Sequence, residues 1–357
     1  MIFTSRRVTG RYGGAVLEAP RARLTAIAVH LPSRYRTMEE IRAGIAAAGS
    51  PYVPRPGLIE DITGVRGVHA CEEGVCASDL AAAAARKALA DAGLTIGEVD
   101  LLLFAATSKD MIEPSTSHLV AAKLGATCPV FDVTNACNSV LNAMEVASAF
   151  IATRRYRRVL IACGEVGSTV TRWHVPDHEA LLRAMPGYTV SDAGAALLLT
   201  AGPAGDGDPG VLALRFTADS TAWNACTVSG GGTMHPRAFD DEHMTIRLNG
   251  DLLRTTAGEG LPFLQRAAER ELETVRSSAF IAVHQIGMPQ FQEMVDKLPL
   301  PADRCMPTVA EHGNCAAASL PLQLVKALET DRIEPGDTVA MLGLASGMSF
   351  GLALIRW

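Results

Sequence analysis

The chain has 357 residues, 48% of them hydrophobic and 20% charged, and a formal net charge of −6 at pH 7. This composition is typical of one large or two ordinary enzyme domains and excludes a disordered or fibrous chain. The acidic balance argues against nucleic acid as a partner, because nucleic-acid binding usually requires a basic face.

Targeting signals and cysteine usage bear on the compartment. Residues 1–14 contain arginines but no apolar run of the kind that marks a secretory signal. The 8 cysteines are scattered through a long chain, which fits reduced thiols better than a disulfide framework. We therefore expect a cytoplasmic protein.

Apolar runs and alanine-rich runs alternate along the chain. The runs that predict buried strands are 101–107, 158–165, 195–200, 279–285 and 338–344. The runs that predict helices are 79–93, 139–154 and 320–330. Such alternation is typical of an α/β fold in which helices cover both faces of the sheets.

The uncharged segment 339–355 could be mistaken for a membrane helix. A spanning helix needs about 20 consecutive apolar residues, and this shorter run is broken by Gly343, Gly347 and Gly351. Two buried strands joined by a glycine turn explain it better. We expect no membrane span.

The two halves of the sequence resemble each other. Segment 135–167 runs from a small-residue helix start through a helix and a charged turn to an apolar strand and a glycine, and segment 313–347 repeats this order. This predicts a duplicated α/β domain, with Cys137 and Asn314 at matching helix starts about a pseudo-twofold axis. The glycine-rich segment 201–210 marks the boundary between the halves.

Cys137 stands where the apolar run 129–133 gives way to a helix. A cysteine at a helix N-terminus feels the partial positive charge of unpaired backbone N–H groups, which lowers its pKa and favours a nucleophilic thiolate. The same N–H groups can hold the oxygen of an acyl group on the sulfur. The alternative is a buried, unreactive thiol, the common state of free cysteines.

Two further polar residues occupy positions where α/β proteins place their chemistry. His284 ends the apolar run 279–283, at the carboxyl end of a predicted parallel strand. Asn314 opens a helix after a glycine. The alternatives are a hydrogen-bonded histidine without chemistry and an ordinary helix cap. No histidine pair has convincing metal-ligand spacing, so we expect no metal.

Together these segments resemble the ketoacyl synthase III branch of the thiolase superfamily, from about Leu24 to Trp357. The motifs that carry the resemblance are TGVRGVH (63–69), EPSTSHLVAAKLG (113–125), FDVTNAC (131–137), VSDAGAA (190–196), LNG (248–250), VHQ (283–285), HGNCAAASLPL (312–322) and GLASGMSFGLALIRW (343–357). It implies a thiolase fold, a duplicated five-layer αβαβα arrangement. Residues 1–23 would be an extension, 24–205 the N-terminal half and 206–357 the C-terminal half.

The resemblance also implies roles for single residues. Cys137, His284 and Asn314 would form a Cys-His-Asn catalytic site, and the backbone N–H groups of Cys137 and Ser346 an oxyanion hole. Substrates would arrive as thioesters of coenzyme A (CoA) or acyl carrier protein, with no further cofactor. Arg254 and Arg266 lie where this family receives its carriers.

Glu113 points to one branch of the superfamily. Residues 113–116, 135–137, 221–224 and 311–314 resemble the head-to-head acyl-CoA condensing enzymes of bacterial olefin and β-lactone biosynthesis. Joining two plain acyl thioesters requires a base for the α-proton, and a carboxylate in an apolar tunnel can serve because burial raises its pKa. Glu113, delivered across a dimer interface, would be that base. The alternative is an exposed glutamate at a helix entry.

Other readings stay open at this stage. The chain could be a decarboxylating ketoacyl synthase that uses malonyl donors, or an acyltransferase that forms no carbon–carbon bond. It could also be a silent subunit of a mixed dimer rather than a homodimer, although the Cys-His-Asn residues argue against silence. We expect segment 168–188, with Trp173, to form a cap over the acyl tunnel.

Overall fold

The computed structural model describes residues 19–250, 269 and 271–357. Five strands of the first half form one sheet, in the order β1-β7-β6-β4-β5. Their bounds are β1 (Arg21–His30), β4 (Leu101–Phe104), β5 (Val130–Asp132), β6 (Arg158–Glu165) and β7 (Ala193–Gly202). β4 runs parallel to β5 and β6, whereas β7 is antiparallel to β6 and to β1.

The second half repeats this sheet. Its order is β8-β13-β12-β11, with bounds β8 (Gly210–Ala218), β11 (Phe280–Val283), β12 (Thr338–Ala345) and β13 (Ser349–Arg356). β11 is parallel to β12, and both remaining pairs are antiparallel, as in the first sheet. A parallel bridge between Ile281 and Cys305 takes the place of a fifth strand. The same order and directions in both sheets confirm the duplication.

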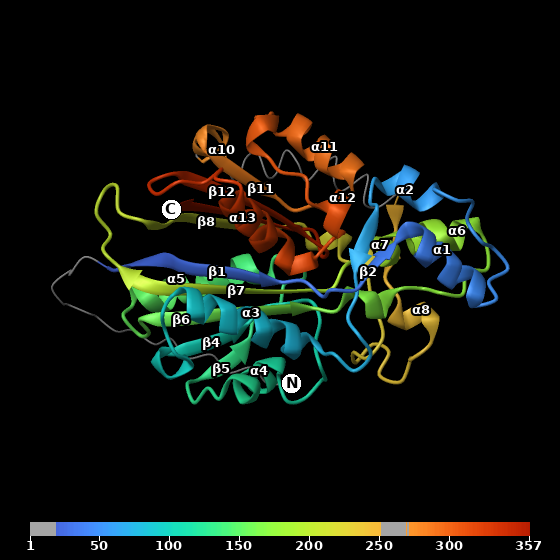
Figure 1. Cartoon of the computed structure of the whole chain (residues 1–357), viewed down its shortest axis with the longest axis horizontal. Helices are drawn as coiled ribbons and strands as arrows, with labels where there is room; N and C mark the ends of the chain where they lie inside the picture. Colours follow the sequence, from blue (N-terminus) through green and yellow to red (C-terminus); the bar gives the residue numbers. More distant parts are fainter. Residues whose placement is uncertain (1–18, 251–268, 270) are drawn as a thin grey trace, which may run out of the picture.

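Helices complete the five layers (Figure 1). They are α3 (Ala77–Asp91) and α4 (Thr116–Leu124) outside the first sheet, α5 (Ser139–Ala152) and α13 (Ser319–Glu329) between the sheets, and α10 (Leu272–Ser277) and α11 (Met288–Lys297) outside the second. α5 and α13 contact both sheets, so they bury apolar side chains on two sides. This explains why their sequences are apolar nearly all round.

α3 lies unusually close to the first sheet. It contains six alanines that are no more than 3% exposed, and alanine permits a short distance between helix and strands. A Cβ atom at Gly164 of β6 would overlap the carbonyl group of Ala77, and one at Gly194 of β7 would overlap that of Leu80. Both glycines are therefore required by packing.

A shift of 180 residues relates the central layer and its strands. It maps α5 onto α13 at their first residues and β6 onto β12 at both ends. It also maps Ala136 onto Ala316, and both have φ of 46°, in the left-handed region that non-glycine residues rarely adopt. The two halves thus share a strained turn before the central helix.

The expected match between Cys137 and Asn314 is wrong by three residues. Under the 180-residue relation, Cys137 corresponds to Ala317, and Asn314 lies three positions earlier. The difference arises because residues Ala316–Ala318 form a 3-10 turn, η5, ahead of α13. The position of Cys137 in one half is therefore filled by Ala317 in the other.

A third group of elements projects beyond one end of both sheets, at the right of Figure 1. It comprises β2 (Tyr35–Thr37), α1 (Met38–Ala47), α2 (Leu58–Thr63), β3 (Gly67–His69), α6 (His178–Arg183), α7 (Met185–Thr189), β9 (Cys226–Thr227), α8 (Asp241–Met244) and β10 (Arg247–Leu248). Several of these share a separate apolar core around Ile45 and Tyr188. Short turns elsewhere are η1 (Ile96–Glu98), η2 (Gly167–Val170), η3 (Ser220–Ala222), η4 (Ala302–Arg304) and α12 (Val309–His312).

The predicted strands and helices all occur, and the uncharged segment 339–355 forms two paired strands, β12 and β13. β1 begins at Arg21, so the expected boundary at residue 24 falls inside a strand. Residues 21–23 continue the pairing of β1 with Thr200–Gly202 of β7. The chain between β7 and β8 covers residues 203–209, inside the glycine-rich segment.

Candidate active site

One cavity of about 480 Å³ lies where the two halves meet the projecting elements. Its lining is mostly apolar, and four of the five catalytic and oxyanion-hole residues expected from the sequence border it: Cys137, His284, Asn314 and Ser346. These four come from the start of α5, the end of β11, the turn before α13 and the turn after β12. The duplicated fold therefore brings together residues up to 209 positions apart in the sequence.

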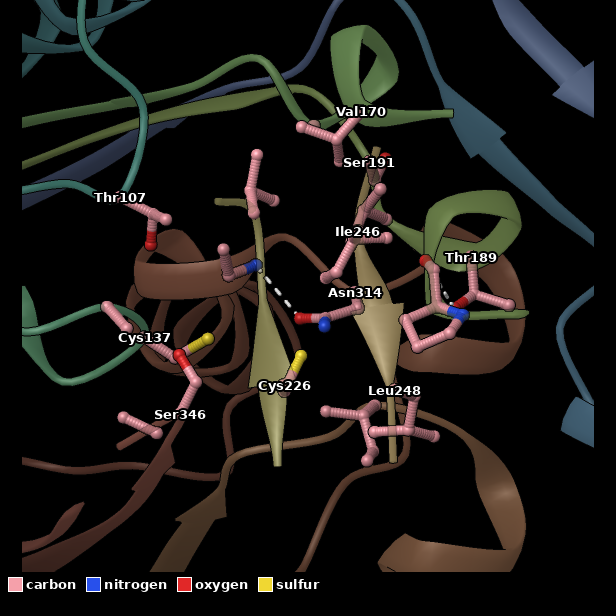
Figure 2. Close-up of a pocket in the computed structure, with 18 of the residues that line it drawn as sticks. Thr107, Cys137, Val170, Thr189, Ser191, Cys226, Ile246, Leu248, Asn314 and Ser346 are labelled. Carbon is pink, nitrogen blue, oxygen red and sulfur yellow. Dashed lines mark hydrogen bonds between the residues drawn. The ribbon is translucent and has the colours of Figure 1, made fainter. Parts of the chain in front are cut away.

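Cys137 is displayed by a tight turn. The side chain of Ser139 closes this turn, because its Oγ accepts a hydrogen bond from the N–H of Asn135 at 2.9 Å and donates to the carbonyl of Ala136 at 2.6 Å. The left-handed backbone at Ala136 turns the next residue toward the cavity. Figure 2 shows the Cys137 sulfur directed into the cavity, beside Ser346.

The prediction that a helix N-terminus lowers the pKa of Cys137 is wrong. α5 begins at Ser139, two residues beyond the thiol. Burial raises the pKa of Cys137 well above its usual value, and the nearby carboxylate of Glu165 raises it further. Loss of hydration therefore outweighs the helix terminus, and the resting thiol is protonated.

His284 directly follows β11. Its backbone N–H donates to the carbonyl of Leu342 at 2.8 Å, which continues the pairing with β12. The next residue fixes the strand end, because Gln285 Oε1 accepts from the N–H groups of Thr308 and Val309 at 2.9 and 3.0 Å. The imidazole is buried, and neither ring nitrogen has a partner among the described residues. Burial lowers the pKa of His284 to about 4, so the ring is neutral at pH 7.

Asn314 is held through its backbone and its side-chain oxygen. Its N–H donates to the carbonyl of Thr189 at 2.7 Å, and its own carbonyl accepts from the N–H of Ser191 at 2.9 Å. Its Oδ1 accepts from the N–H of Ala316 at 2.9 Å. With the oxygen engaged, the amide nitrogen faces the cavity (Figure 2). Asn314 thus presents a hydrogen-bond donor.

Glu113 does not border the cavity of its own chain. It is exposed in the loop that precedes α4. Its neighbour Ile112 is 82% exposed and Met111 is 45% exposed, an unusual pair on a protein surface. At the far side of this loop, Asp132 accepts hydrogen bonds from the N–H groups of Thr116 and Ser117 at 3.0 and 2.9 Å.

Glu165 is a cavity residue that sequence reasoning missed. It ends β6, is 1% exposed, and accepts hydrogen bonds from the N–H groups of Thr107, Ser108 and Ala317 at 2.8, 3.0 and 3.3 Å. Burial raises the pKa of Glu165, and these hydrogen bonds oppose the rise. A glutamate closing an otherwise apolar strand was the available signal.

The 180-residue relation also identifies the backbone N–H groups that correspond to those of the expected oxyanion hole. The N–H groups of Cys137 and Ser346 correspond to those of Ala317 and Val166, which we call the second donor pair. The N–H of Ala317 donates to Glu165, and that of Val166 donates to Ser108 Oγ at 2.9 Å. The second donor pair is therefore already satisfied by side chains of the protein.

The remaining cavity wall comes from the projecting elements. Within the expected cap, residues 168–188, the lining residues are Val170, Leu182, Met185 and Pro186. Trp173 is not among them, because it packs on Gly44 of α1. Cys226 of β9 faces the cavity across from Cys137 (Figure 2) and was not singled out from the sequence. Its position in a two-residue strand gave no pattern to detect.

Three expectations concern other kinds of site. Arg254 and Arg266 lie outside the described residues. Within residues 19–250, 269 and 271–357, no three histidine, cysteine, aspartate or glutamate side chains are grouped as metal ligands. In the same part of the chain no helix has the length and apolar character needed to cross a membrane.

The chain is similar to a known protein family and to characterised relatives. The family described as 3-oxoacyl-[acyl-carrier-protein (ACP)] synthase III matches residues 131–220, and its C-terminal counterpart matches residues 270–357. A β-ketoacyl-[acyl-carrier-protein] synthase III of Bordetella petrii is 32% identical, covering 91% of this chain and 95% of the relative. That of Rhodospirillum centenum is 29% identical, covering 94% and 99%.

Solved structures of OleA from Xanthomonas campestris are also similar. The cerulenin-bound form superposes with a TM-score of 0.82 at 25% identity, covering 95% of this chain and 98% of OleA. A glutamate-to-alanine variant of OleA gives the same TM-score and identity, covering 96% and 100%.

Fold and site together define a thiolase-fold condensing enzyme, an acyltransferase with a cysteine in an apolar cavity. More closely, the chain belongs to the 3-oxoacyl-[acyl-carrier-protein] synthase III family.

Proposed function

We propose that this enzyme joins two acyl thioesters in a Claisen condensation without decarboxylation, through an acyl group carried on Cys137. The observation that carries the proposal is the clustering of Cys137, His284 and Asn314 around one apolar cavity. Likeness to OleA, whose solved forms include variants at a cysteine, a histidine and a glutamate, supports the same chemistry.

In the first step the sulfur of Cys137 attacks the carbonyl carbon of an acyl-CoA. The thiol is protonated at rest, so the neutral imidazole of His284 takes its proton as the sulfur–carbon bond forms. The backbone N–H groups of Cys137 and Ser346 hold the developing oxyanion. CoA then leaves as a thiolate and receives the proton from His284, which leaves an acyl thioester on Cys137.

In the second step another acyl-CoA forms an enolate. Its carbonyl oxygen accepts hydrogen bonds from neutral His284 and from the amide nitrogen of Asn314, both of which are donors in this cavity. A base removes the α-proton, and the carbanion attacks the Cys137 thioester. The cysteine sulfur leaves as a thiolate and takes up the proton that the base removed, which restores the resting thiol, and the product is a β-ketoacyl thioester.

The base in this proposal is Glu113 of a partner subunit. Glu113 is exposed in its own chain, so it can act only if the loop enters another subunit's cavity. A homodimer is supported by the exposed apolar residues Met111 and Ile112 and by β5, which pairs with one strand within the part of the chain that the structure describes and carries exposed Phe131. An unpaired edge beside apolar side chains is a typical pairing surface.

The test is condensation without a malonyl donor. Purified protein incubated with two acyl-CoAs should release CoA and form the β-ketoacyl product, while Glu113→Ala should still acylate Cys137 but form no product. Glu73→Ala, which removes another exposed glutamate, serves as the control. Full condensation by Glu113→Ala would contradict the assignment of the base.

A decarboxylating synthase is the second proposal, favoured by the β-ketoacyl-[acyl-carrier-protein] synthase III relatives at 32% and 29% identity. Such an enzyme makes its carbanion by losing CO₂ and requires no base. Product that forms only when a malonyl thioester of CoA or acyl carrier protein is added would favour this reaction. Acylation of Cys137 is common to both.

A further inference from the structure

The two N–H groups of the proposed oxyanion hole belong to separate strained turns. Cys137 follows Ala136, which has φ of 46°, and Ser346 begins a turn that ends at Met348, with φ of 45°. Non-glycine residues in the left-handed region are unfavourable by about 1–3 kcal/mol and persist only where surrounding contacts hold them. Some contact must therefore fix each turn and their separation.

One serine joins the two turns. Ser349 is the first residue of β13 and pairs with Ala345 across the second turn. Its Oγ accepts hydrogen bonds from Nδ2 of Asn135 at 3.0 Å and from Nδ2 of Asn138 at 3.2 Å. Nδ2 of Asn138 also donates to the Ser349 carbonyl at 3.0 Å. We call Asn135, Asn138 and Ser349 the serine clamp, since it holds Cys137 from both sides.

The side chain of Asn138 does not cap the helix that it precedes. Asparagine is among the best helix N-caps, and Asn138 occupies the N-cap of α5, yet its side chain makes no capping hydrogen bond there. It is fully buried and reaches β13 instead. In the other half, the corresponding N-cap of α13 is Ala318, which has no such group.

Packing leaves the serine clamp little freedom. A Cβ atom at Gly343 of β12 would overlap Oδ1 of Asn138, so the glycine permits the asparagine to approach the sheet. Ser349 is 7% exposed and Asn138 is 0% exposed. Hydrogen bonds in such a low-dielectric interior are strong and directional.

We propose that the serine clamp sets the separation of the Cys137 and Ser346 N–H groups, so that Ser349 and the two asparagines are positioning residues for the oxyanion hole. This inference rests on the proposed acylation of Cys137. The physical reason is geometric, because oxyanion donors act only within hydrogen-bond distance of the developing charge, and a displacement of about 1 Å can cost on the order of a hundredfold in rate.

The test compares two reactions of the same sulfur. Acylation by an acyl-CoA develops an oxyanion, whereas alkylation by iodoacetamide displaces iodide at a saturated carbon and develops none. In Ser349→Ala the acylation rate constant should fall roughly tenfold or more, with KM for the acyl-CoA little changed. The iodoacetamide rate should stay within about twofold of wild type, because the thiol and His284 are untouched.

Matched variants separate positioning from stability. Ser349→Thr keeps the hydroxyl and should restore acylation, and Asn135→Ala should repeat the loss from the opposite side of the serine clamp. Ser278→Ala removes another fully buried hydroxyl, outside the second sheet, and should leave the ratio of the two rates unchanged. Equal falls in both reactions, or normal acylation by Ser349→Ala and Asn135→Ala, would overturn the inference. Wild-type protein that forms no acyl-Cys137 would instead overturn the proposed function.

Discussion

His284 is neutral because its ring is buried, and neither ring nitrogen has a hydrogen-bond partner among the described residues. Its pKa of about 4 lies below the usual value near 6.5, so the unfolded chain binds a proton more readily than the folded protein. Stability from this group is complete above pH 6.5 and is lost as the pH falls toward 4. By linkage, the loss at pH 5 is on the order of 2 kcal/mol.

His284→Gln should therefore be less sensitive to acid than wild type. Between pH 7 and pH 5, wild type should lose about 2 kcal/mol more of its free energy of unfolding than the variant does. Urea unfolding of both proteins at the two pH values measures this difference, and other acidic groups cancel in the comparison. Equal losses in the two proteins would show that the folded histidine titrates normally.

Sequence reasoning succeeded for residues that have a motif and a defined place in a strand or helix. Cys137, His284 and Asn314 each lie within five residues of a predictable strand or helix, so their convergence followed from the duplicated fold. Glu165 and Cys226 were missed for different reasons. Glu165 is a lone acid whose partners include backbone groups distant in sequence. Cys226 lies in an irregular segment without periodicity.

At the scale of elements, the spacing between α3 and the first sheet depends on glycine. Gly194→Ala should force α3 away from β7, because its Cβ atom would overlap the Leu80 carbonyl, a rigid backbone group. Overpacking of this kind typically costs about 1–3 kcal/mol. We expect a loss of about 2 kcal/mol or more in the free energy of unfolding, measured in urea.

Gly202→Ala provides the control on the same strand. The nearest atom to a Cβ there is Cβ of Arg23, at 3.6 Å, an ordinary contact. That variant should change stability by less than about 0.5 kcal/mol. A Gly194→Ala protein as stable as Gly202→Ala would mean that α3 moves at no cost.

Element prediction was accurate where an apolar run or an alanine-rich helix was long. β6 coincides with its predicted range, 158–165, because both of its ends are marked by charged residues. The short elements of the projecting group had no such signal, since α2, α6 and α7 are stabilised by contacts in a shared apolar core, and β9 by pairing with β10, rather than by their own sequences. The boundary at residue 24 was misplaced because charged Arg21 and Arg23 still belong to β1.

At the scale of the whole molecule, a base acting between subunits can be tested by mixing. Cys137→Ser keeps Glu113, and Glu113→Ala keeps Cys137, so a mixed dimer contains one cavity with both groups. Each variant alone should be inactive in condensation, and equal mixing after unfolding and refolding together should restore roughly a quarter of wild-type activity. Activity is measured as β-ketoacyl product per total protein.

Two outcomes would contradict this arrangement. No recovery in mixtures that size measurements show to contain mixed dimers would place Glu113 in its own subunit's reaction or outside the reaction. A monomer at working concentration with full condensing activity would exclude any contribution from a partner.

The second donor pair is already hydrogen-bonded, and this bears on how many acyl groups one chain can hold. A duplicated fold starts with two equivalent places where backbone N–H groups could receive an anionic oxygen. In this chain the carboxylate of Glu165 and the hydroxyl of Ser108 occupy one of them permanently. Among the described residues, a nearly twofold molecule therefore leaves one of its two corresponding donor pairs open to an acyl oxygen, so under the proposed function we expect one acyl group per chain.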